Sequence, residues 1–106
     1  DEKGREVSQL KEAYKKGHPM AACNLSAAYG EGIGVKRNAE TGFDWARKAS
    51  AMHFYGGYQN MCYCLSNGDG TPKDSNAAKV WRTKAQQELT KHEREVEKWW
   101  EKASRS

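Results

Sequence analysis

One sequence pattern occurs twice in this chain of 106 residues, and it limits the possible folds more than any other feature. The second copy lies 36 residues after the first. The matching pairs are Leu25 with Met61, Gly32 with Gly68, Gly34 with Gly70, Asn38 with Asp74, Trp45 with Trp81, and Ala49 with Ala85. A fixed period of this length indicates a repeat architecture, in which each unit buries its apolar face against a neighbour.

The first part of each unit predicts a helix that ends at a glycine. Ala21, Leu25 and Tyr29 are spaced by four residues, so they share one helical face. The stretch that begins at Gly30 is rich in glycine. Glycine accepts the positive φ that helix ends and tight turns need, so we expect the helix to end in this stretch.

The second part of each unit predicts another helix. Asn38 is a good N-cap for it. Small and aromatic residues then share one face, namely Phe43, Ala46 and Ala49. We expect Trp45 and its counterpart Trp81 to be equivalent core residues. The unit is therefore a helical hairpin that must stack on a neighbouring hairpin.

Read in order, the chain predicts an all-α solenoid of about two and a half repeats and five helices. The array covers residues 1–85 and consists of a half repeat at 5–17, a repeat at 18–52 and a repeat at 53–85. A first helix is expected over Arg5–Lys16, and Pro19 opens the next. Gly56 and Gly57 predict a helix break within the stretch Ala51–Tyr58, before a helix over Gln59–Asn67.

The last helix is predicted to continue beyond the repeats. From Asp74 onward there is no Gly or Pro, and good helix formers dominate. Residues 86–106 form an extension whose apolar positions approach a heptad stripe. A helix that was solvated on all sides would need no such stripe, so we expect it to bind a protein partner. The predicted partner-binding residues are Leu89, Val96, Trp99 and Trp100.

Composition narrows the function further. Hydrophobic residues make up 37% of the chain and charged residues 30%, which leaves a thin core for a free-standing domain. We therefore expect either a piece of a longer array or a partner that covers its surface. The sequence contains no run of eighteen apolar residues, so it predicts no membrane span. The net charge of +4 is modest and scattered, which disfavours nucleic acid as a partner.

The sequence predicts no catalytic, cofactor or metal site. The run Gly30-Glu31-Gly32-Ile33-Gly34 follows a predicted helix rather than a strand, so it does not fit a phosphate-binding loop. Cys62 and Cys64 would point to nearly opposite sides of a helix, which is a poor arrangement for zinc. The three cysteines are expected to be buried small hydrophobes, although a disulfide from Cys23 to Cys62 or Cys64 remains open.

The repeated pattern resembles the Sel1-like repeat, a relative of the tetratricopeptide repeat. The resemblance covers about Leu10 to Ala85. It rests on Leu25, Tyr29, the Gly-x-Gly segment, Asn38, Trp45 and Lys48-Ala49, with their second copies. The family resemblance implies a helical-hairpin solenoid that acts as a protein-interaction module and not as an enzyme.

A narrower resemblance points to the mitochondrial Sel1-repeat assembly factors of cytochrome c oxidase, which have β-lactamase-like bacterial relatives. It rests on the stretches 22–27, 68–74 and 82–87. It implies an accessory or assembly subunit of a respiratory complex, located in the mitochondrion, with the intermembrane space as the expected compartment. Ser50 and Tyr58 stand where that family has paired cysteines, so its disulfides are missing here. The alternatives are an adaptor in another compartment and a β-lactamase-like or thiol-active enzyme.

Overall fold

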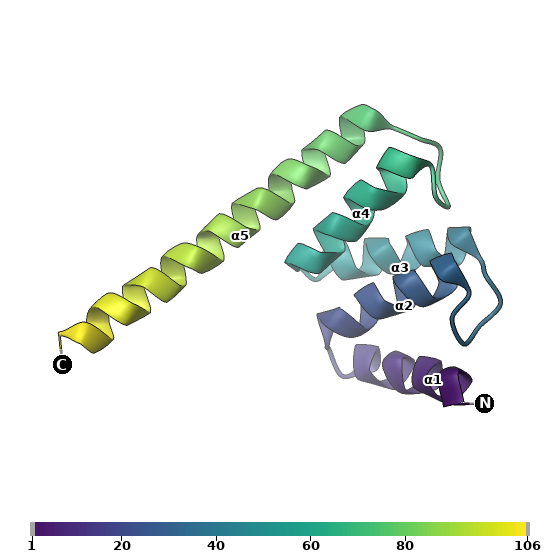
Figure 1. Ribbon diagram of the computed structural model, residues 1–106, viewed down its shortest axis with the longest axis horizontal. Coiled ribbons are helices and arrows are strands. Elements are labelled where there is room, and N and C mark those ends of the chain that lie inside the picture. Colours follow the sequence, from purple (N-terminus) through teal and green to yellow (C-terminus); the bar gives the residue numbers. More distant parts are fainter. Residues whose placement is uncertain (1, 106) are drawn as a thin grey trace.

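The computed structural model describes residues 2–105 and contains five α-helices and no strand within them (Figure 1). The helices are α1 (Glu2–Lys15), α2 (Pro19–Glu31), α3 (Ala39–Ala51), α4 (Tyr55–Asn67) and α5 (Ser75–Ser104). The predicted all-α fold and the number of helices are confirmed, and α5 is the single long helix that the composition after Asp74 indicates.

The helices stack in chain order as a short solenoid. Helix α2 packs on α1 and α3, α4 packs on α3 and α5, and α2 also contacts α4, the first helix of the following repeat. Figure 1 shows that only the first half of α5 lies along α4, while its second half projects away from the array. The molecule is therefore elongated, with extents of 53 × 36 × 17 Å.

The helix ends repeat the same local chemistry with the period of the sequence. Helices α2 and α4 end at Gly32 and Gly68, which adopt left-handed φ angles of 75° and 67°. The N-cap residues of α3 and α5 are Asn38 and Asp74. The side-chain oxygen of Asn38 accepts a hydrogen bond from the Thr41 amide at 3.1 Å. The side-chain oxygen of Asp74 accepts one from the Ala77 amide at 3.0 Å. The predicted caps are confirmed, and they fix the turn of each hairpin.

The second glycine of each turn brings the backbone of neighbouring repeats together. A Cβ atom on Gly34 would lie 2.4 Å from the Lys3 carbonyl oxygen in α1, and one on Gly70 would lie 2.0 Å from the Ala39 carbonyl oxygen in α3. Lys3 and Ala39 are themselves one period apart. Each turn thus rests directly on the start of the preceding repeat's second helix, where no side chain can fit.

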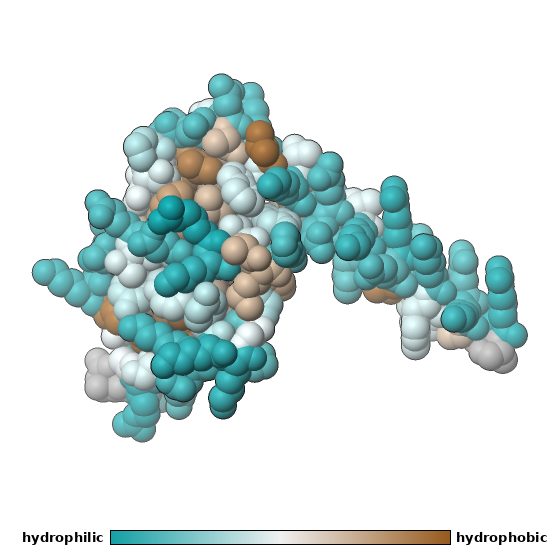
Figure 2. Space-filling model, turned by 180° about the vertical axis from the view of Figure 1, so that it is seen from behind, coloured by the Kyte–Doolittle hydropathy of each residue, from teal (hydrophilic) through white to brown (hydrophobic). Residues whose placement is uncertain are grey.

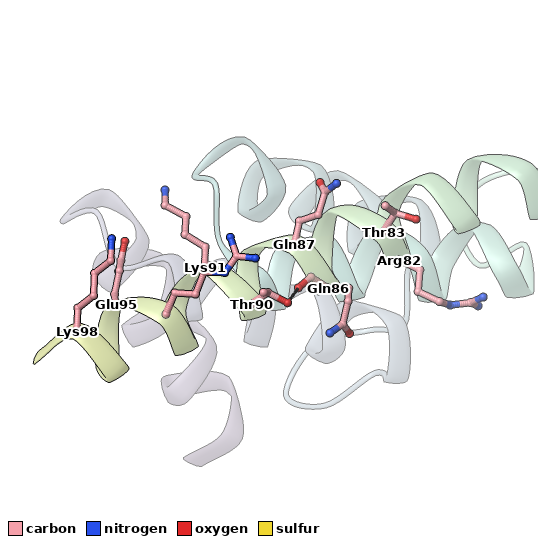
Figure 3. A pocket seen from close by; sticks show the side chains of 9 residues that line it. Arg82, Thr83, Gln86, Gln87, Thr90, Lys91, Glu95 and Lys98 are labelled. Carbon is pink, nitrogen blue, oxygen red and sulfur yellow. Dashed lines mark hydrogen bonds between the residues drawn. The ribbon is translucent and has the colours of Figure 1, made fainter. Parts of the chain in front are cut away.

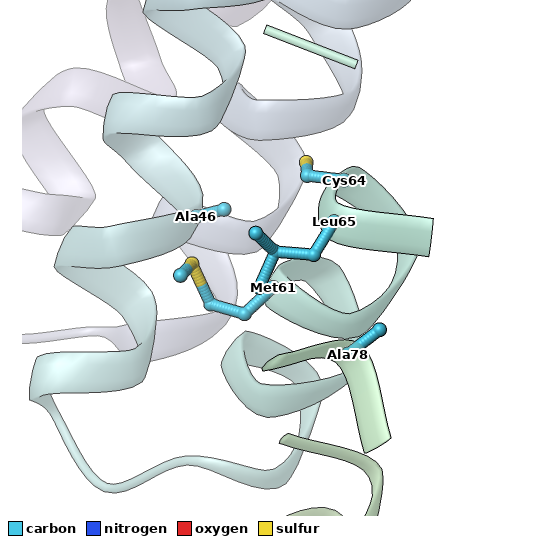
Figure 4. Packing of buried hydrophobic residues seen from close by; sticks show 5 residues of the cluster. All are labelled: Ala46, Met61, Cys64, Leu65 and Ala78. Atoms are coloured by element: carbon cyan, nitrogen blue, oxygen red, sulfur yellow. The ribbon is translucent and has the colours of Figure 1, made fainter. Parts of the chain in front are cut away.

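The core is built mainly from small residues and a few larger apolar ones. Leu25 is fully buried, as are the predicted core positions Ala46 and Ala49. A cluster between α3, α4 and the start of α5 contains Ala46, Met61, Cys64, Leu65 and Ala78. In Figure 4 the side chains of Met61 and Leu65 extend from α4 toward Ala46 of α3. The alanines let the helices approach closely, and the long side chains of α4 fill the remaining space.

The predicted helix break within residues 51–58 is confirmed, but it precedes the two glycines, and α4 starts at Tyr55 rather than at Gln59. Both glycines lie in the first turn of α4, and the chain turns earlier, where His53 adopts a φ of +53°. Gly57 has a packing role instead, because a Cβ there would lie 2.5 Å from the carbonyl carbon of Ala49 and from the amide nitrogen of Ser50. The glycine therefore allows α4 to cross the end of α3 at backbone contact.

Trp45 and Trp81 have equivalent environments, but both are half-buried rather than core residues. Each ring packs against a tyrosine, with centroids 5.0 Å apart for Tyr14 and Trp45 and 5.8 Å apart for Tyr58 and Trp81. A lysine three residues further along covers the ring, with its Nζ 4.2 Å from the Trp45 centroid and 4.6 Å from the Trp81 centroid. The expectation of full burial is thus corrected, because the lysine stem and the solvent share the outer edge of each ring.

We expect Gly70→Ala to destabilise the array strongly and Gly17→Ala to do so weakly. Both glycines have positive φ angles, of 77° and 90°, so alanine is strained at each. Only Gly70 faces backbone within contact distance, since nothing lies within 4 Å of a Cβ at Gly17. Gly70→Ala should cost about 1–3 kcal/mol more than Gly17→Ala in urea unfolding. Equal losses would show that the turn does not rest on Ala39.

We expect Trp45→Ala and Trp81→Ala to lower the free energy of unfolding by similar amounts, on the order of 2 kcal/mol. This is below the 3–5 kcal/mol typical of a fully buried tryptophan, because both side chains are only partly buried. Trp99→Ala is the matched comparison, since that ring is 62% exposed and should change stability by less than about 0.5 kcal/mol. Urea unfolding of the three variants measures these differences.

Candidate protein-interaction surfaces

A groove with a volume of about 620 Å³ lies on the array, between α2, α4 and the beginning of α3. Its lining mixes small and apolar residues with polar side chains, which are Ser26, Glu31, Arg37, Asn60, Tyr63, Asn67 and Asp69. Tyr63 is 61% exposed, although α4 is a core helix. An open groove of this kind can accept an extended segment of another protein, with hydrogen bonds to its backbone and contact with the tyrosine ring.

Side-chain bonds hold the two walls of this groove in register. Arg37, in the first turn, donates through Nε to the Gly30 carbonyl at 2.9 Å and forms an ion pair through Nη2 with Asp69 of the second turn at 3.4 Å. Asn60 of α4 donates to the Cys23 carbonyl of α2 at 3.3 Å. An exposed ion pair adds at most about 1 kcal/mol, so its main effect is to orient the turns.

Sequence reasoning missed this groove. Asn60, Tyr63 and Asn67 are spaced by three and four residues, so they share one face of α4 that lies away from Met61 and Leu65. That spacing of amide and aromatic side chains was the available signal. It is weak, because an exposed helix face carries polar residues whether or not it binds anything.

The second surface is the projecting half of α5. Of the four predicted partner-binding residues, Trp99 is 62% exposed, Trp100 61% and Val96 41%, whereas Leu89 is half-buried. The two indole rings contact each other edge to face, with centroids 5.1 Å apart. Figure 2 shows this half as a mainly hydrophilic arm with a few paler and brown residues along one edge. The structure thus leaves three of the four apolar side chains open to solvent.

The opposite face of α5 is polar. A depression of about 740 Å³ runs along it, and its lining includes Arg82, Lys91, Arg94, Glu95 and Lys98. In Figure 3 all the labelled side chains come from the one helix and fan out to several sides. Because no other element supplies a second wall, this is an open, charged helix face rather than an enclosed binding site.

The three cysteines are free thiols, so the disulfide left open by the sequence is not formed in this structure. Cys23 and Cys64 are buried, and Cys62 is half-buried on the other side of α4. Burial raises the pKa of Cys23 from 9.0 to about 11. Burial, together with the charge of Asp69, raises the pKa of Cys64 to about 11 as well. Both thiols are therefore protonated at neutral pH and are poor nucleophiles.

No group of three or more His, Cys, Asp or Glu side chains within residues 2–105 is placed to hold a metal ion. Over the same residues, no helix combines the length and apolar character needed to cross a membrane. The features that stand out on the described surface are the groove on the array and the apolar edge of α5.

Comparison with known proteins identifies the repeat. The family model of the Sel1 repeat matches residues 19–54 and 49–85, which include helices α2 to α4 and the first part of α5. The chain belongs to the Sel1 repeat family. Proteins of this family generally mediate protein–protein interactions and are typically not catalysts. The predicted resemblance to Sel1-like repeats is therefore confirmed at the level of the family.

Two solved structures show the same fold. A Sel1 repeat protein from Oxalobacter formigenes is 33% identical, with a TM-score of 0.70 over 74% of this chain. The protective antigen c5321 of uropathogenic Escherichia coli, described as displaying an SLR fold, is 34% identical, with a TM-score of 0.75 over 79% of this chain. This Sel1 repeat chain spans 60% of the first protein and 18% of the second. No curated protein matches it.

We expect the buried thiols to react slowly at neutral pH. In a Cys62→Ala variant, labelling of Cys23 and Cys64 at pH 8 should be much slower than in the urea-unfolded protein, and it should accelerate toward pH 11. Because their folded pKa lies above the unfolded value of 9.0, these thiols stabilise the fold fully below pH 9, and this contribution is lost between pH 9 and 11. Rapid labelling of the folded protein at pH 7 would reveal an activated thiolate instead.

Proposed function

We propose that this Sel1 repeat protein is a scaffold that is anchored in a protein complex through the projecting half of α5. The observation that carries this proposal is the exposure of Trp99 and Trp100 on a helix that has left the array. The groove on the array is a second contact surface, with polar chemistry that suits an extended segment.

Contacts within the chain contribute little to the stability of the projecting half of α5, because its residues 91–105 are exposed. Isolated helices of this length are marginal in water, because nucleation is costly and tertiary packing normally supplies the stability. Ala85 is the last fully buried residue of α5, residues 88–90 are partly buried, and every residue from 91 to 105 is exposed, so the array does not support the helix beyond residue 90. A binding partner that covers the apolar edge would supply the missing packing. Tryptophan is enriched among the residues that dominate interface energies, which favours Trp99 and Trp100 as anchors.

The narrower proposal is an accessory or assembly subunit of a mitochondrial respiratory complex related to cytochrome c oxidase. Its support is the sequence resemblance of the stretches around residues 22–27 and 68–87, and it includes a location in the mitochondrion, with the intermembrane space as the specific compartment. Ser50 and Tyr58 are buried at the positions where that family has cysteines. A role in this complex would therefore not depend on the family's disulfides.

Two alternatives remain as competing proposals. An adaptor in another compartment would use the same two surfaces with different partners. A β-lactamase-like or thiol-active enzyme would need a reactive nucleophile, and the raised pKa values of Cys23 and Cys64 disfavour those two thiols. Turnover of a chromogenic β-lactam by the purified chain would favour the enzyme over the scaffold.

We expect the Trp99→Ala, Trp100→Ala double variant to keep its fold but to lose its complex. The two rings are exposed in the single chain, so the thermal unfolding of the array should be unchanged. Truncating anchors of this kind costs about 2 kcal/mol or more of binding energy, which is at least about a 30-fold loss of affinity. The measurement is affinity purification of the tagged chain at its natural level, with the recovered proteins identified by mass spectrometry.

The matched control is Val80→Ala, which removes an exposed apolar side chain of α5 outside the apolar edge. The control should retain the complex. Full recovery of the complex with the double variant would contradict the anchor, and unfolding of the double variant would assign the two tryptophans to the core. Respiratory-complex subunits among the recovered proteins would support the narrower proposal, and their absence would favour an adaptor elsewhere.

A further inference from the structure

The apolar edge of α5 continues the stripe that packs on the array, and it follows a heptad. Positions Leu89, Val96 and Ala103 are seven residues apart, and so are Ala85, His92 and Trp99. The two series alternate in steps of three and four, which is the a and d pattern of two-stranded coiled coils. The series that starts at Leu89 occupies the a positions, and the series that starts at Ala85 occupies the d positions. Ala85 is buried against α4, whereas residues 91–105 are all exposed. The free part of the stripe thus begins beyond the array.

We propose that this free stripe pairs with the same stripe of a second copy of the chain, in antiparallel orientation. This inference rests on the proposed anchoring role of the projecting half of α5 and names the partner. Val96 of each copy lies opposite Trp99 of the other in the two central layers, and His92 lies opposite Ala103 in the outer layers. The pairing is symmetric about a twofold axis between residues 97 and 98.

Charge complementarity selects this register. In an antiparallel pair the flanking g positions of one helix face the g positions of the other. Glu95 and Lys102 occupy these positions, so each copy's Glu95 lies beside the other copy's Lys102, which gives two opposite-charge pairs. On the other flank Glu93 lies beside Trp100 of the second copy, and that ring can rest on the Glu93 methylene groups. No like charges face each other across this pair.

The neighbouring registers are less favourable. A shift of one heptad toward the array puts Glu93 opposite Glu93 and Glu95 opposite Glu95, and these two like-charge pairs offset the two Glu88–Lys102 pairs that the shift forms. It also requires Ala103 to pack on Ala85, which α4 already covers. A shift away from the array puts Lys102 opposite Lys102.

Parallel pairing also brings like charges together. Its flanking pairs join a g position of one helix to the following e position of the other, so Glu88 would lie beside Glu93 on both sides of the pair. These like-charge pairs disfavour the parallel dimer. The antiparallel register between residues 92 and 103 is therefore selected.

The apolar area is sufficient for a weak dimer. Four tryptophan rings, each now about 60% exposed, would become covered in the pair. At about 150–250 Å² for a buried aromatic side chain, they contribute on the order of 500 Å². Val96, Ala103 and the stems of the flanking charged residues add to this, which brings the total toward the roughly 1,200 Å² of the smallest specific interfaces. We therefore expect a reversible dimer.

Charge reversal tests both the partner and the register. Glu95→Lys alone and Lys102→Glu alone each create two like-charge pairs, so each purified variant should dimerise at least tenfold more weakly than the wild type. The Glu95→Lys, Lys102→Glu double variant restores both opposite-charge pairs and should dimerise like the wild type. An equimolar mixture of the two single variants should form a heterodimer, because every pair in it joins opposite charges. Sedimentation equilibrium over a range of concentrations measures all four.

Lys98→Glu and Glu101→Lys are the matched controls, because they change the same charges on the outer face of α5 and should leave the dimer intact. A wild-type chain that stays monomeric at high concentration overturns the proposal, and so does a dimer that is insensitive to the single reversals. The chain could be monomeric and still require Trp99 and Trp100 for the co-purification of another protein. In that case the proposed anchoring function stands, and only the proposal that the partner is a second copy is wrong. If recovery is also independent of the two tryptophans, both proposals fail.

Discussion

The contact between each turn glycine and the preceding repeat's second helix determines the arrangement of the other helices. Gly34 lies against Lys3 and Gly70 lies against Ala39 at distances that leave no room for a side chain. Two equivalent backbone contacts, one period apart, give successive repeats the same offset. The offset brings α2 alongside α4 and places the two turns close enough for Arg37 to reach Asp69. The groove on the array is a consequence of this spacing.

Close backbone approach also explains why a chain with few large apolar residues can fold. At Gly57 helix α4 meets the end of α3 without an intervening side chain, and fully buried Ala46 packs between the same two helices. Fully buried Ala49 packs on α2 instead, against Ala22 and Cys23. Dispersion contacts between backbones then replace part of the area that large side chains would bury. The aromatic residues are moved outward as a result, which leaves Trp45 and Trp81 half-buried at the edges of the hairpins.

Features set by local chemistry could be predicted from the sequence, and features set by distant contacts could not. The caps at Asn38 and Asp74 depend on a residue and its next three neighbours, so the repeat pattern was enough to find them. From the sequence alone, Gly57 suggested a helix break. A glycine is needed there because the backbone of α3 lies against it, and that contact exists only in the folded chain. The half-burial of Leu89 and the groove beside Tyr63 likewise depend on how elements meet, and no periodic signal reports that.

A single uninterrupted helix joins the two candidate surfaces, and this has a geometric consequence. From Ala85, the last residue buried on the array, to Trp99 is a distance of about 21 Å at 1.5 Å per residue. No Gly or Pro in α5 offers a hinge, so a molecule bound at Trp99 stands at a fixed distance and direction from the groove. If that molecule is a second copy, the antiparallel pair places two grooves at opposite ends of one rod. A ligand with two suitable segments could then bind both, and its second binding event would be governed by effective concentration. The long helix would in this way turn two weak surfaces into one bivalent scaffold.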